Sequence, residues 1–247
     1  MQNSKFQLKS QNLTSNYKKH KNNNPLQKFL LGNFYNDLIS IVKEINDSGQ
    51  ARMTTKGDSI ALLQNDNKEN RNDERGKEDS GQARMIIETI LDAGCGEGFT
   101  LNKLYQEEMG EELEGIDGSE EAISIGKKIH PHLSLKRASI YKLPYKDSSF
   151  DLVLSTEVLE HLEEPEKALK EIIRVSRKYI LLSVPNEPFF MLSNFLRGKN
   201  ITRWGNDIDH INHWSARSFE KFVEHEKVKI IKVKTPFPWT VVLIEKI

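Results

Sequence analysis

From residue 86 onward, short apolar runs alternate along the chain with segments whose apolar residues recur at helical spacing. The apolar runs predict strands at residues 86–92, 112–117, 133–138, 150–155, 179–184, 228–234 and 240–246. The helical spacing predicts helices over residues 99–109, 119–129, 165–175 and 215–225. This alternation predicts an α/β fold with a mostly parallel sheet and helices on both faces, in which the last two strands are antiparallel neighbours.

Particular residues mark where three of these helices begin. Ser119 and Ser215 have the type of side chain that caps a helix N-terminus. Glu120 and Glu121 follow Ser119, and their negative charges complement the helix dipole. Pro165 suits the first turn of a helix, where the N–H group that proline lacks has no intrahelical partner.

The chain before the first predicted strand has a different composition. Residues 1–24 are rich in Asn, Lys, Gln and Ser, and they predict a mobile arm that a ligand orders near Tyr17 and His20. Apolar residues at helical spacing then predict a helix or a helix pair over residues 26–45, with one buried face.

Residues 46–85 contain an internal repeat. The heptamer DSGQARM occurs at 47–53 and again at 79–85, and the stretch QNDNKENRNDERGKED that leads into the second copy contains no apolar residue. Two copies are too few for a solenoid, and this composition cannot build a core. We therefore predict a mobile arm at 1–24 and one domain at 25–247, interrupted by a disordered insertion at 46–85.

Composition and charge narrow the class of protein. Lys plus Arg equals Asp plus Glu at 36 each, so the chain has no basic excess that would indicate a nucleic-acid or anionic membrane partner. No apolar run approaches the roughly 20 residues that span a bilayer, and the polar N-terminus has no apolar signal-peptide region. The lone Cys95 excludes an internal disulfide framework and a multi-cysteine zinc site. These features predict a soluble, cytoplasmic protein and leave its oligomeric state open.

Glycines follow the first predicted strand in the segment LDAGCGEG, residues 91–98. Gly94, Gly96 and Gly98 permit a tight turn and the close approach of a ligand at the carboxyl edge of the sheet, where open α/β folds bind ligands. Asp117 ends the next strand, 19 residues after Gly98, where a carboxylate can accept the ribose hydroxyls of an adenosine ligand. No Gly-Lys-Ser/Thr follows, which excludes a P-loop. Taken alone, the glycines also suit a tight strand–helix turn without a ligand.

Three motifs that follow one another along the chain make the prediction of a ligand site more specific. They are LDAGCGEG, then GIDGS at 115–119, then LPYKDSSFDLVLSTEVLEHL at 143–162. Together they resemble the class I S-adenosylmethionine-dependent methyltransferases, particularly the small-molecule, methyltransferase type 11-like branch. The resemblance covers about residues 86–185. It implies a Rossmann-like seven-stranded sheet whose last strand inserts antiparallel, and S-adenosyl-L-methionine as the cofactor.

The resemblance also implies which residues contact each part of the cofactor. For the amino-acid part these are Asp92, Gly94, Cys95, Gly96 and Gly98; for the ribose, Asp117 with Gly118; for the adenine, Ser139 and Ile140; and for the floor of the site, Ser155 and Glu157. One position departs from the family, which commonly has an acidic residue where this chain has Ser139. Serine accepts a hydrogen bond only as a neutral group, so we expect either weaker adenine binding or a backbone contact in its place.

The charge of the candidate site agrees with this cofactor. Asp92, Glu97, Asp117 and Glu157 are acidic, and the glycine loop contains no lysine or arginine. An acidic lining suits a cationic sulfonium and disfavours a pyrophosphate. The composition therefore favours S-adenosylmethionine over a dinucleotide.

Two segments carry candidates for the acceptor side. His161 follows the fourth predicted strand, near the expected methyl-transfer cleft, and His210 lies in DHINHW at 209–214. Both are candidate catalytic residues, although either can instead cap or pack a helix. Candidate substrate contacts are Tyr17, His20, Asn186, His213 and Trp214. Two histidines with Asp209 are few ligands for a metal, so we expect none, and we expect Cys95 to be a packed residue rather than a nucleophile.

These features predict a methyltransferase that moves a methyl group from S-adenosylmethionine to an oxygen or nitrogen atom of a small or medium-sized acceptor. The acceptor classes considered are metabolites, glycans and lipid precursors. One alternative is a catalytically inactive S-adenosylmethionine-binding protein, and Ser139 makes this conceivable. The other is an NAD(P)-linked oxidoreductase. Its fingerprint requires a third glycine one residue later than Gly98, and that glycine is absent from this chain.

Overall fold

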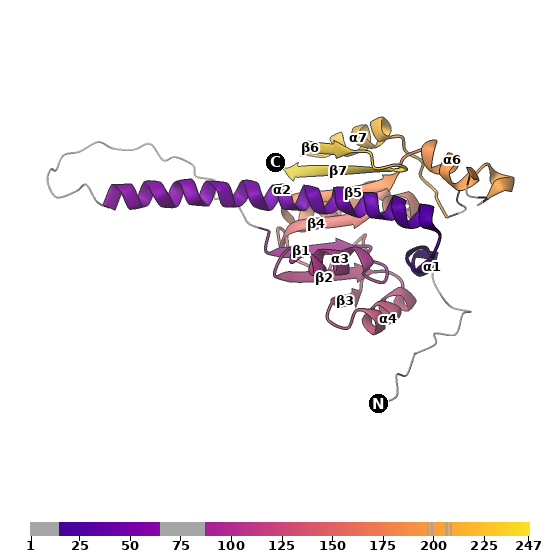
Figure 1. The fold of residues 1–247 in the computed structure, drawn as a ribbon, viewed down its shortest axis with the longest axis horizontal. Coiled ribbons are helices and arrows are strands. Elements are labelled where there is room, and N and C mark those ends of the chain that lie inside the picture. The colour runs from indigo at the N-terminus through magenta and orange to yellow at the C-terminus, as the bar shows by residue number, and fades with distance from the viewer. Residues whose placement is uncertain (1–14, 65–86, 197, 199, 206, 208) are drawn as a thin grey trace, which may run out of the picture.

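The computed structural model describes residues 15–64, 87–196, 198, 200–205, 207 and 209–247 (Figure 1). Its strands are β1 (Thr89–Ala93), β2 (Glu112–Asp117), β3 (Ser134–Arg137), β4 (Phe150–Thr156), β5 (Ser176–Pro185), β6 (Val228–Lys234) and β7 (Trp239–Lys246). Its helices are α1 (Ser15–Lys21), α2 (Pro25–Gln64), α3 (Phe99–Gln106), α4 (Glu120–Ile129), α5 (Pro165–Val175), α6 (Phe189–Leu196) and α7 (Ala216–Glu224), with 3-10 turns η1 (Leu159–His161) and η2 (Ile201–Arg203).

The strands form one seven-stranded sheet in the order β3-β2-β1-β4-β5-β7-β6. Neighbouring strands from β3 to β5 are parallel, whereas β7 is antiparallel to both β5 and β6. The predicted α/β fold with an antiparallel last strand is therefore confirmed. The chain order reverses between β1 and β4, which places the ligand crevice of such folds beyond the carboxyl ends of these two strands.

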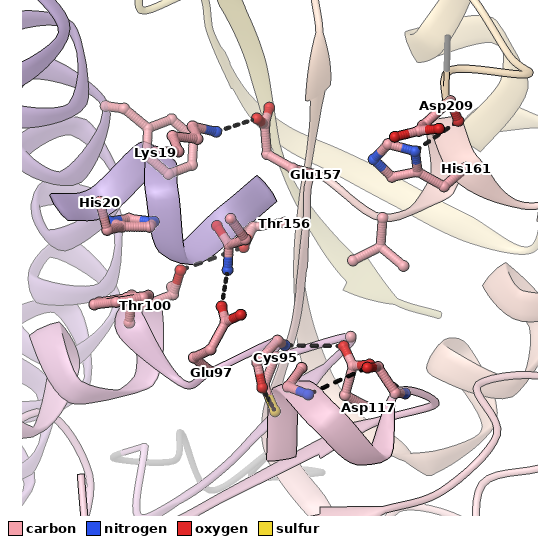
Figure 2. Close-up of a pocket in the computed structure, with 18 of the residues that line it drawn as sticks. Lys19, His20, Cys95, Glu97, Thr100, Asp117, Thr156, Glu157, His161 and Asp209 are labelled. Carbon is pink, nitrogen blue, oxygen red and sulfur yellow. Dashed lines mark hydrogen bonds and ion pairs between the residues drawn. The ribbon is translucent and has the colours of Figure 1, made fainter. Parts of the chain in front are cut away.

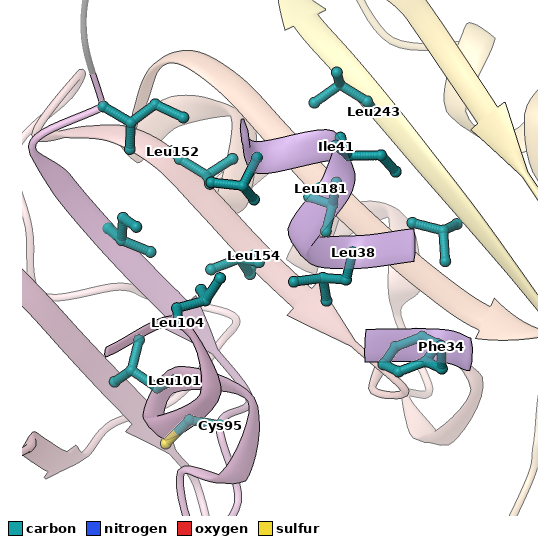
Figure 3. Packing of buried hydrophobic residues seen from close by; sticks show 14 of the residues in the cluster. Phe34, Leu38, Ile41, Cys95, Leu101, Leu104, Leu152, Leu154, Leu181 and Leu243 are labelled. Atoms are coloured by element: carbon teal, nitrogen blue, oxygen red, sulfur yellow. The ribbon is translucent and has the colours of Figure 1, made fainter. Parts of the chain in front are cut away.

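Both faces of the central strands β4, β5 and β7 are buried, which explains why these strands contain continuous apolar runs. Along β4, Leu152 and Leu154 belong to one core cluster and Val153 belongs to the other. The first cluster packs α2 and α3 against the sheet, with Leu38 and Ile41 of α2 fully buried (Figure 3). The second cluster packs α5 and α7 on the opposite face.

The predicted helix starts agree with the structure. Ser119 Oγ accepts a hydrogen bond from Ala122 N at 3.2 Å, so Ser119 caps α4. Ser215 and Ser218 form a reciprocal capping box at the start of α7. Pro165 is the first residue of α5. The helix α6, which lies between β5 and α7 along the chain, was not predicted.

The helix α2 extends beyond the predicted residues 26–45, and its backbone is helical to Gln64. This differs from the disorder expected from residue 46, whereas residues 65–86 lie outside the described residues. The extended part contains no proline, and a single interior glycine such as Gly49 or Gly57 costs only about 1 kcal/mol. Within the described ranges, no helix is long and apolar enough to cross a membrane.

Candidate functional site

The glycine loop joins β1 to α3 at the carboxyl edge of the sheet. Gly94, Gly96 and Gly98 have φ angles of 90°, 54° and 81°, which favour glycine over residues with a side chain. A Cβ atom at Gly94 would lie 2.4 Å from Val158 Cγ2, so the loop passes directly against the residue before η1. Gly94 N and Cys95 N both donate to the carbonyl of Ile116, at 2.8 and 2.9 Å. The loop is therefore held against β2.

Asp117 ends β2 beside this loop. Its Oδ2 accepts a hydrogen bond from Gly96 N at 2.9 Å, and its Oδ1 accepts one from Ser119 N at 2.7 Å (Figure 2). The side chain thus faces the glycine loop, as the spacing between the two motifs suggested. Its carboxylate is only half-buried, which leaves it accessible from the cavity described below.

Asp92 lies in β1 below the loop and is 1% exposed. Neither of its carboxylate oxygens has a hydrogen-bond partner among the described residues. Burial, with a smaller contribution from the negative charge of Asp117, raises the pKa of Asp92 to about 7. A buried carboxylate without donors is unfavourable, so a cationic ligand near it would relieve that cost.

A cavity of about 500 Å³ opens over the loop. From the predicted residues it is lined by Gly94, Cys95, Gly96, Asp117, Glu157, His20, His161 and His210. Lining residues that the sequence analysis did not single out include Tyr35, Thr156 and Trp239, together with Asn16 and Lys19 of α1. This cavity therefore joins five of the eleven predicted cofactor residues to both candidate catalytic histidines.

The helix α1 closes one side of this cavity. Asn16 Nδ2 donates to Glu97 Oε2 at 2.7 Å, and Lys19 forms an ion pair with Glu157 at 2.6 Å (Figure 2). The His20 ring stacks on Phe99 with their centroids 4.1 Å apart. Burial lowers the pKa of His20 to about 3, so this ring is neutral at pH 7. This differs from the mobile arm predicted for residues 1–24, because residues 15–21 form a helix that these contacts hold against the cavity, whereas residues 1–14 lie outside the described residues.

The opposite side of the cavity contains two histidines. His161 Nδ1 lies 2.7 Å from the carbonyl oxygen of Asp209, and the rings of His161 and His210 meet edge to face with centroids 5.0 Å apart. Burial lowers the pKa of His210 to about 4. Glu160, next to His161, is 1% exposed, and burial raises the pKa of its carboxyl well above the usual range.

Several predicted cofactor contacts lie outside the cavity lining: Asp92, Gly98, Gly118, Ser139, Ile140 and Ser155. Asp92, Ile140 and Ser155 are buried beneath or beside it. Ser139 is exposed, and its Oγ accepts a hydrogen bond from Tyr141 N at 3.3 Å. Roles for these residues stay predictions.

Most of the predicted substrate contacts also lie outside the lining. The ring of Trp214 packs against those of Phe219 and Phe222. Asn186 is buried, and its Oδ1 accepts a hydrogen bond from Ala216 N at 3.1 Å. His213 Nδ1 lies 3.9 Å from Glu187, and the ring of Tyr17 lies 6.2 Å from that of Phe99, a residue that does line the cavity. Of the five candidates, only His20 lines the cavity.

Comparison with known proteins adds an independent line of support. A family model described as a methyltransferase domain matches residues 91–180. A protein of Mycobacterium tuberculosis described as a probable S-adenosylmethionine-dependent methyltransferase is 28% identical over 109 residues, which are 43% of this chain and 39% of that relative. Norajmaline N-methyltransferase of Rauvolfia serpentina is 34% identical over 110 residues, 42% of this chain and 35% of the relative. The chain thus spans well under half the length of these curated relatives.

The fold has solved counterparts of similar extent. The crystal structure of magnesium protoporphyrin IX methyltransferase from Synechocystis, with bound SAH, superposes with a TM-score of 0.55 and 15% identity. The alignment covers 91% of this chain and 88% of that one, so the likeness extends beyond the family match to the whole fold. On its motifs, its sheet and these relatives, the chain is similar to S-adenosylmethionine-dependent methyltransferases, and residues 91–180 match a methyltransferase domain.

Proposed function

We propose that this protein transfers a methyl group from S-adenosylmethionine to an oxygen or nitrogen atom of a small or medium-sized acceptor. The observation that carries the proposal is the single cavity that contains both the glycine loop with Asp117 and the histidine pair. Its volume of about 500 Å³ lies within the range of small-molecule sites, roughly 300–1,000 Å³. The N-methyltransferase from Rauvolfia, similar over its matched segment, supports an acceptor of this size.

The residues at the glycine loop fit this cofactor. When bound, S-adenosylmethionine supplies a methyl group on a positively charged sulfur. The buried, unpartnered carboxylate of Asp92 provides negative charge for a cationic group, and Glu97 and Asp117 add to it. The glycines let the backbone approach the amino-acid part, and Asp117 presents its carboxylate where the ribose is expected.

The histidine pair fits the acceptor side. His210 is neutral at pH 7 because its pKa is lowered, and His161 has one ring nitrogen occupied by the Asp209 carbonyl. A neutral imidazole can accept a proton or coordinate a cation. A hydroxyl acceptor needs help in losing its proton, whereas an amine needs less. The protein also holds donor and acceptor in one partly enclosed site, which lowers the entropic cost of their reaction.

Methyl-labelled cofactor tests this proposal directly. The full chain is incubated with labelled S-adenosylmethionine and fractions of small metabolites, glycans, lipids, proteins and nucleic acids. We expect label in a small-molecule, glycan or lipid fraction, and loss of that labelling in Asp117→Ala. Binding of the cofactor without transfer to any fraction would indicate an inactive binding protein, and transfer only to nucleic acid or protein would contradict the acceptor class.

A further inference from the structure

We propose that Glu160, His161 and His210 form a binding site for a divalent cation, of the class to which zinc and cobalt belong, on the acceptor side of the cavity. Each residue offers one ligand atom, and these atoms all lie within 4.8 Å of one another. Two imidazoles and one carboxylate are a ligand set that borderline divalent ions accept. His161 and His210 also line the cavity that holds the glycine loop.

The buried carboxylate of Glu160 is the first independent observation for a ligand here. Its side chain is 1% exposed, and neither of its oxygens has a hydrogen-bond partner among the described residues. The nearest imidazole nitrogen, Nε2 of His161, is 4.0 Å from Oε1, which is too far for a hydrogen bond. A cation held between the two groups would satisfy the carboxylate. Bonds of about 2.0–2.2 Å in tetrahedral geometry place two ligand atoms about 3.3–3.6 Å apart, so the side chains would close in by several tenths of an ångström on binding.

The orientation of His161 is the second observation. Its Nδ1 lies 2.7 Å from the carbonyl oxygen of Asp209, and because a carbonyl oxygen only accepts, Nδ1 carries the hydrogen. The lone pair of the neutral ring is then on Nε2, the nitrogen that faces Glu160. A hydrogen bond from the outer nitrogen to a backbone carbonyl is how proteins commonly orient a metal-binding histidine.

The backbone holds the third ligand in place. Ile211 N and Asn212 N, which follow His210, both donate to the carbonyl oxygen of Glu160, at 2.8 and 3.0 Å. Asn212 Nδ2 donates to the carbonyls of Leu159 and Leu162, at 3.1 and 2.7 Å. The loop that carries His210 is thereby fixed to η1, which carries the other two ligands, so the site is preorganised.

Glu157 lines the same cavity as the two histidine ligands. One of its oxygens is paired with Lys19, whereas the other is buried without a partner among the described residues.

Three protein ligands leave coordination positions open toward the cavity, as in catalytic rather than structural zinc sites. A hydroxyl oxygen coordinated there would have a lowered pKa and would release its proton to water. This role, unlike the binding site itself, rests on the proposed function.

The test uses the full chain, free of any histidine tag and stripped of metal with a chelator that is then removed. Co²⁺ is titrated with visible absorption as the readout, and Zn²⁺ with calorimetry. We expect one equivalent per chain, with a Kd of about 1 µM or lower. Glu160→Gln and His210→Ala should each weaken binding at least about tenfold, whereas His225→Ala, which removes an exposed histidine outside the cavity, should leave it unchanged.

Less than one tenth of an equivalent on the unmodified chain, or equal affinity in Glu160→Gln, His210→Ala and the control, would overturn the site. Thermal unfolding verifies that each variant is folded, and His161→Ala, at an exposed position, serves if Glu160→Gln does not fold. Titration of the metal-free chain with S-adenosylmethionine separates the two proposals. Cofactor binding without metal binding would contradict this inference alone, and metal binding without cofactor binding would contradict the proposed function.

Discussion

The two sides of the cavity are built differently. The cofactor side comes from the ends of β1 and β2, and its glycine loop and Asp117 are joined by a hydrogen bond between segments only 21 residues apart. The histidine side joins η1 to a loop about 50 residues later, through contacts to the backbone of Glu160. The first is set by a recurring strand–turn–helix geometry, whereas the second depends on how this chain folds back on itself. Motifs therefore reveal cofactor chemistry more readily than acceptor chemistry.

The largest effect should come where the two sides touch. Gly94→Ala places a methyl group 2.4 Å from Val158 Cγ2 at a φ of 90°. Left-handed backbone costs about 1–2 kcal/mol and overpacking about 1–3 kcal/mol, so we expect the free energy of unfolding to fall by about 2–5 kcal/mol. Chemical denaturation measures this loss.

Gly118→Ala is the matched control for that experiment, because nothing lies within 4 Å of a Cβ at Gly118. Adding Val158→Ala to Gly94→Ala should restore the part of the stability that is lost to the clash. If Gly94→Ala is as stable as the unmodified protein, the loop does not pass against η1 as described.

Removing the carboxylate of Asp117 should affect the cofactor side alone. Asp117→Ala loses the acceptor expected for the ribose and the hydrogen bond that orients Gly96, so cofactor affinity should fall more than tenfold, about 1.4 kcal/mol. Calorimetry measures the change, with Asp147→Ala, an exposed aspartate outside the cavity lining, as the control. Equal affinities in the three proteins would remove the ribose role, and weaker Co²⁺ binding in Asp117→Ala would show that the two sides are coupled.

The raised pKa of Asp92 predicts how the cofactor side responds to pH. A cationic ligand prefers the ionised carboxylate, so cofactor affinity should rise about tenfold between pH 6 and pH 8, through the pKa of about 7. Asp92→Asn should bind more weakly at pH 8 and lose this dependence. A pH profile identical in the two proteins would contradict the effect.

The raised pKa of Asp92 also makes the stability of the folded protein depend on pH, and stability changes in the opposite direction to cofactor affinity. In the unfolded chain Asp92 has its ordinary pKa of 3.8, whereas in the folded protein its pKa is about 7. Between these two pH values the folded protein keeps the proton on Asp92 and the unfolded chain has released it. This carboxyl therefore makes the cofactor-free protein less stable as pH rises from about 4 to about 7. Asp92→Asn should remove this contribution, which denaturation at pH 5 and pH 8 measures.

The smallest effect should come from removing the last part of α2 together with the chain that leads from it toward β1. Asn46 Oδ1 accepts a hydrogen bond from Ile87 N at 3.0 Å, so the two ends of the predicted insertion lie together. Replacing residues 48–84 with a short flexible linker should leave the melting temperature and cofactor affinity nearly unchanged. A large loss of melting temperature would show that this segment contributes to the core.

The parts of the fold that the sequence predicted depend on local signals. Strands buried on both faces are continuous apolar runs, and the caps at Ser119 and Ser215 are short-range hydrogen bonds. The end of α2 was harder to predict because polar residues without proline remain compatible with a helix. In α6, Phe189 and Leu196 are exposed while Asn194 is buried, so the usual amphipathic pattern is absent.

The candidate site, too, was predictable only where its residues follow the predicted strands. Asp117 and the glycines follow strands, so their convergence at the sheet edge could be inferred from spacing. Lys19 and Trp239 reach the cavity from opposite ends of the chain, and Nζ of Lys19 lies 5.1 Å from the Trp239 ring centroid. Trp214 shows the reverse problem, since a tryptophan in a polar segment turned out to pack against Phe219. Only the three-dimensional packing distinguishes these cases.

The most direct test of the proposed function begins with the cofactor. Calorimetric titration of the full chain with S-adenosylmethionine, and separately with NAD⁺ and NADP⁺, compares a sulfonium cofactor with pyrophosphate cofactors at the acidic loop. We predict one S-adenosylmethionine site with a Kd in the micromolar range or below, about −8 kcal/mol, and no binding of either dinucleotide. Binding of a dinucleotide without binding of S-adenosylmethionine would contradict the account.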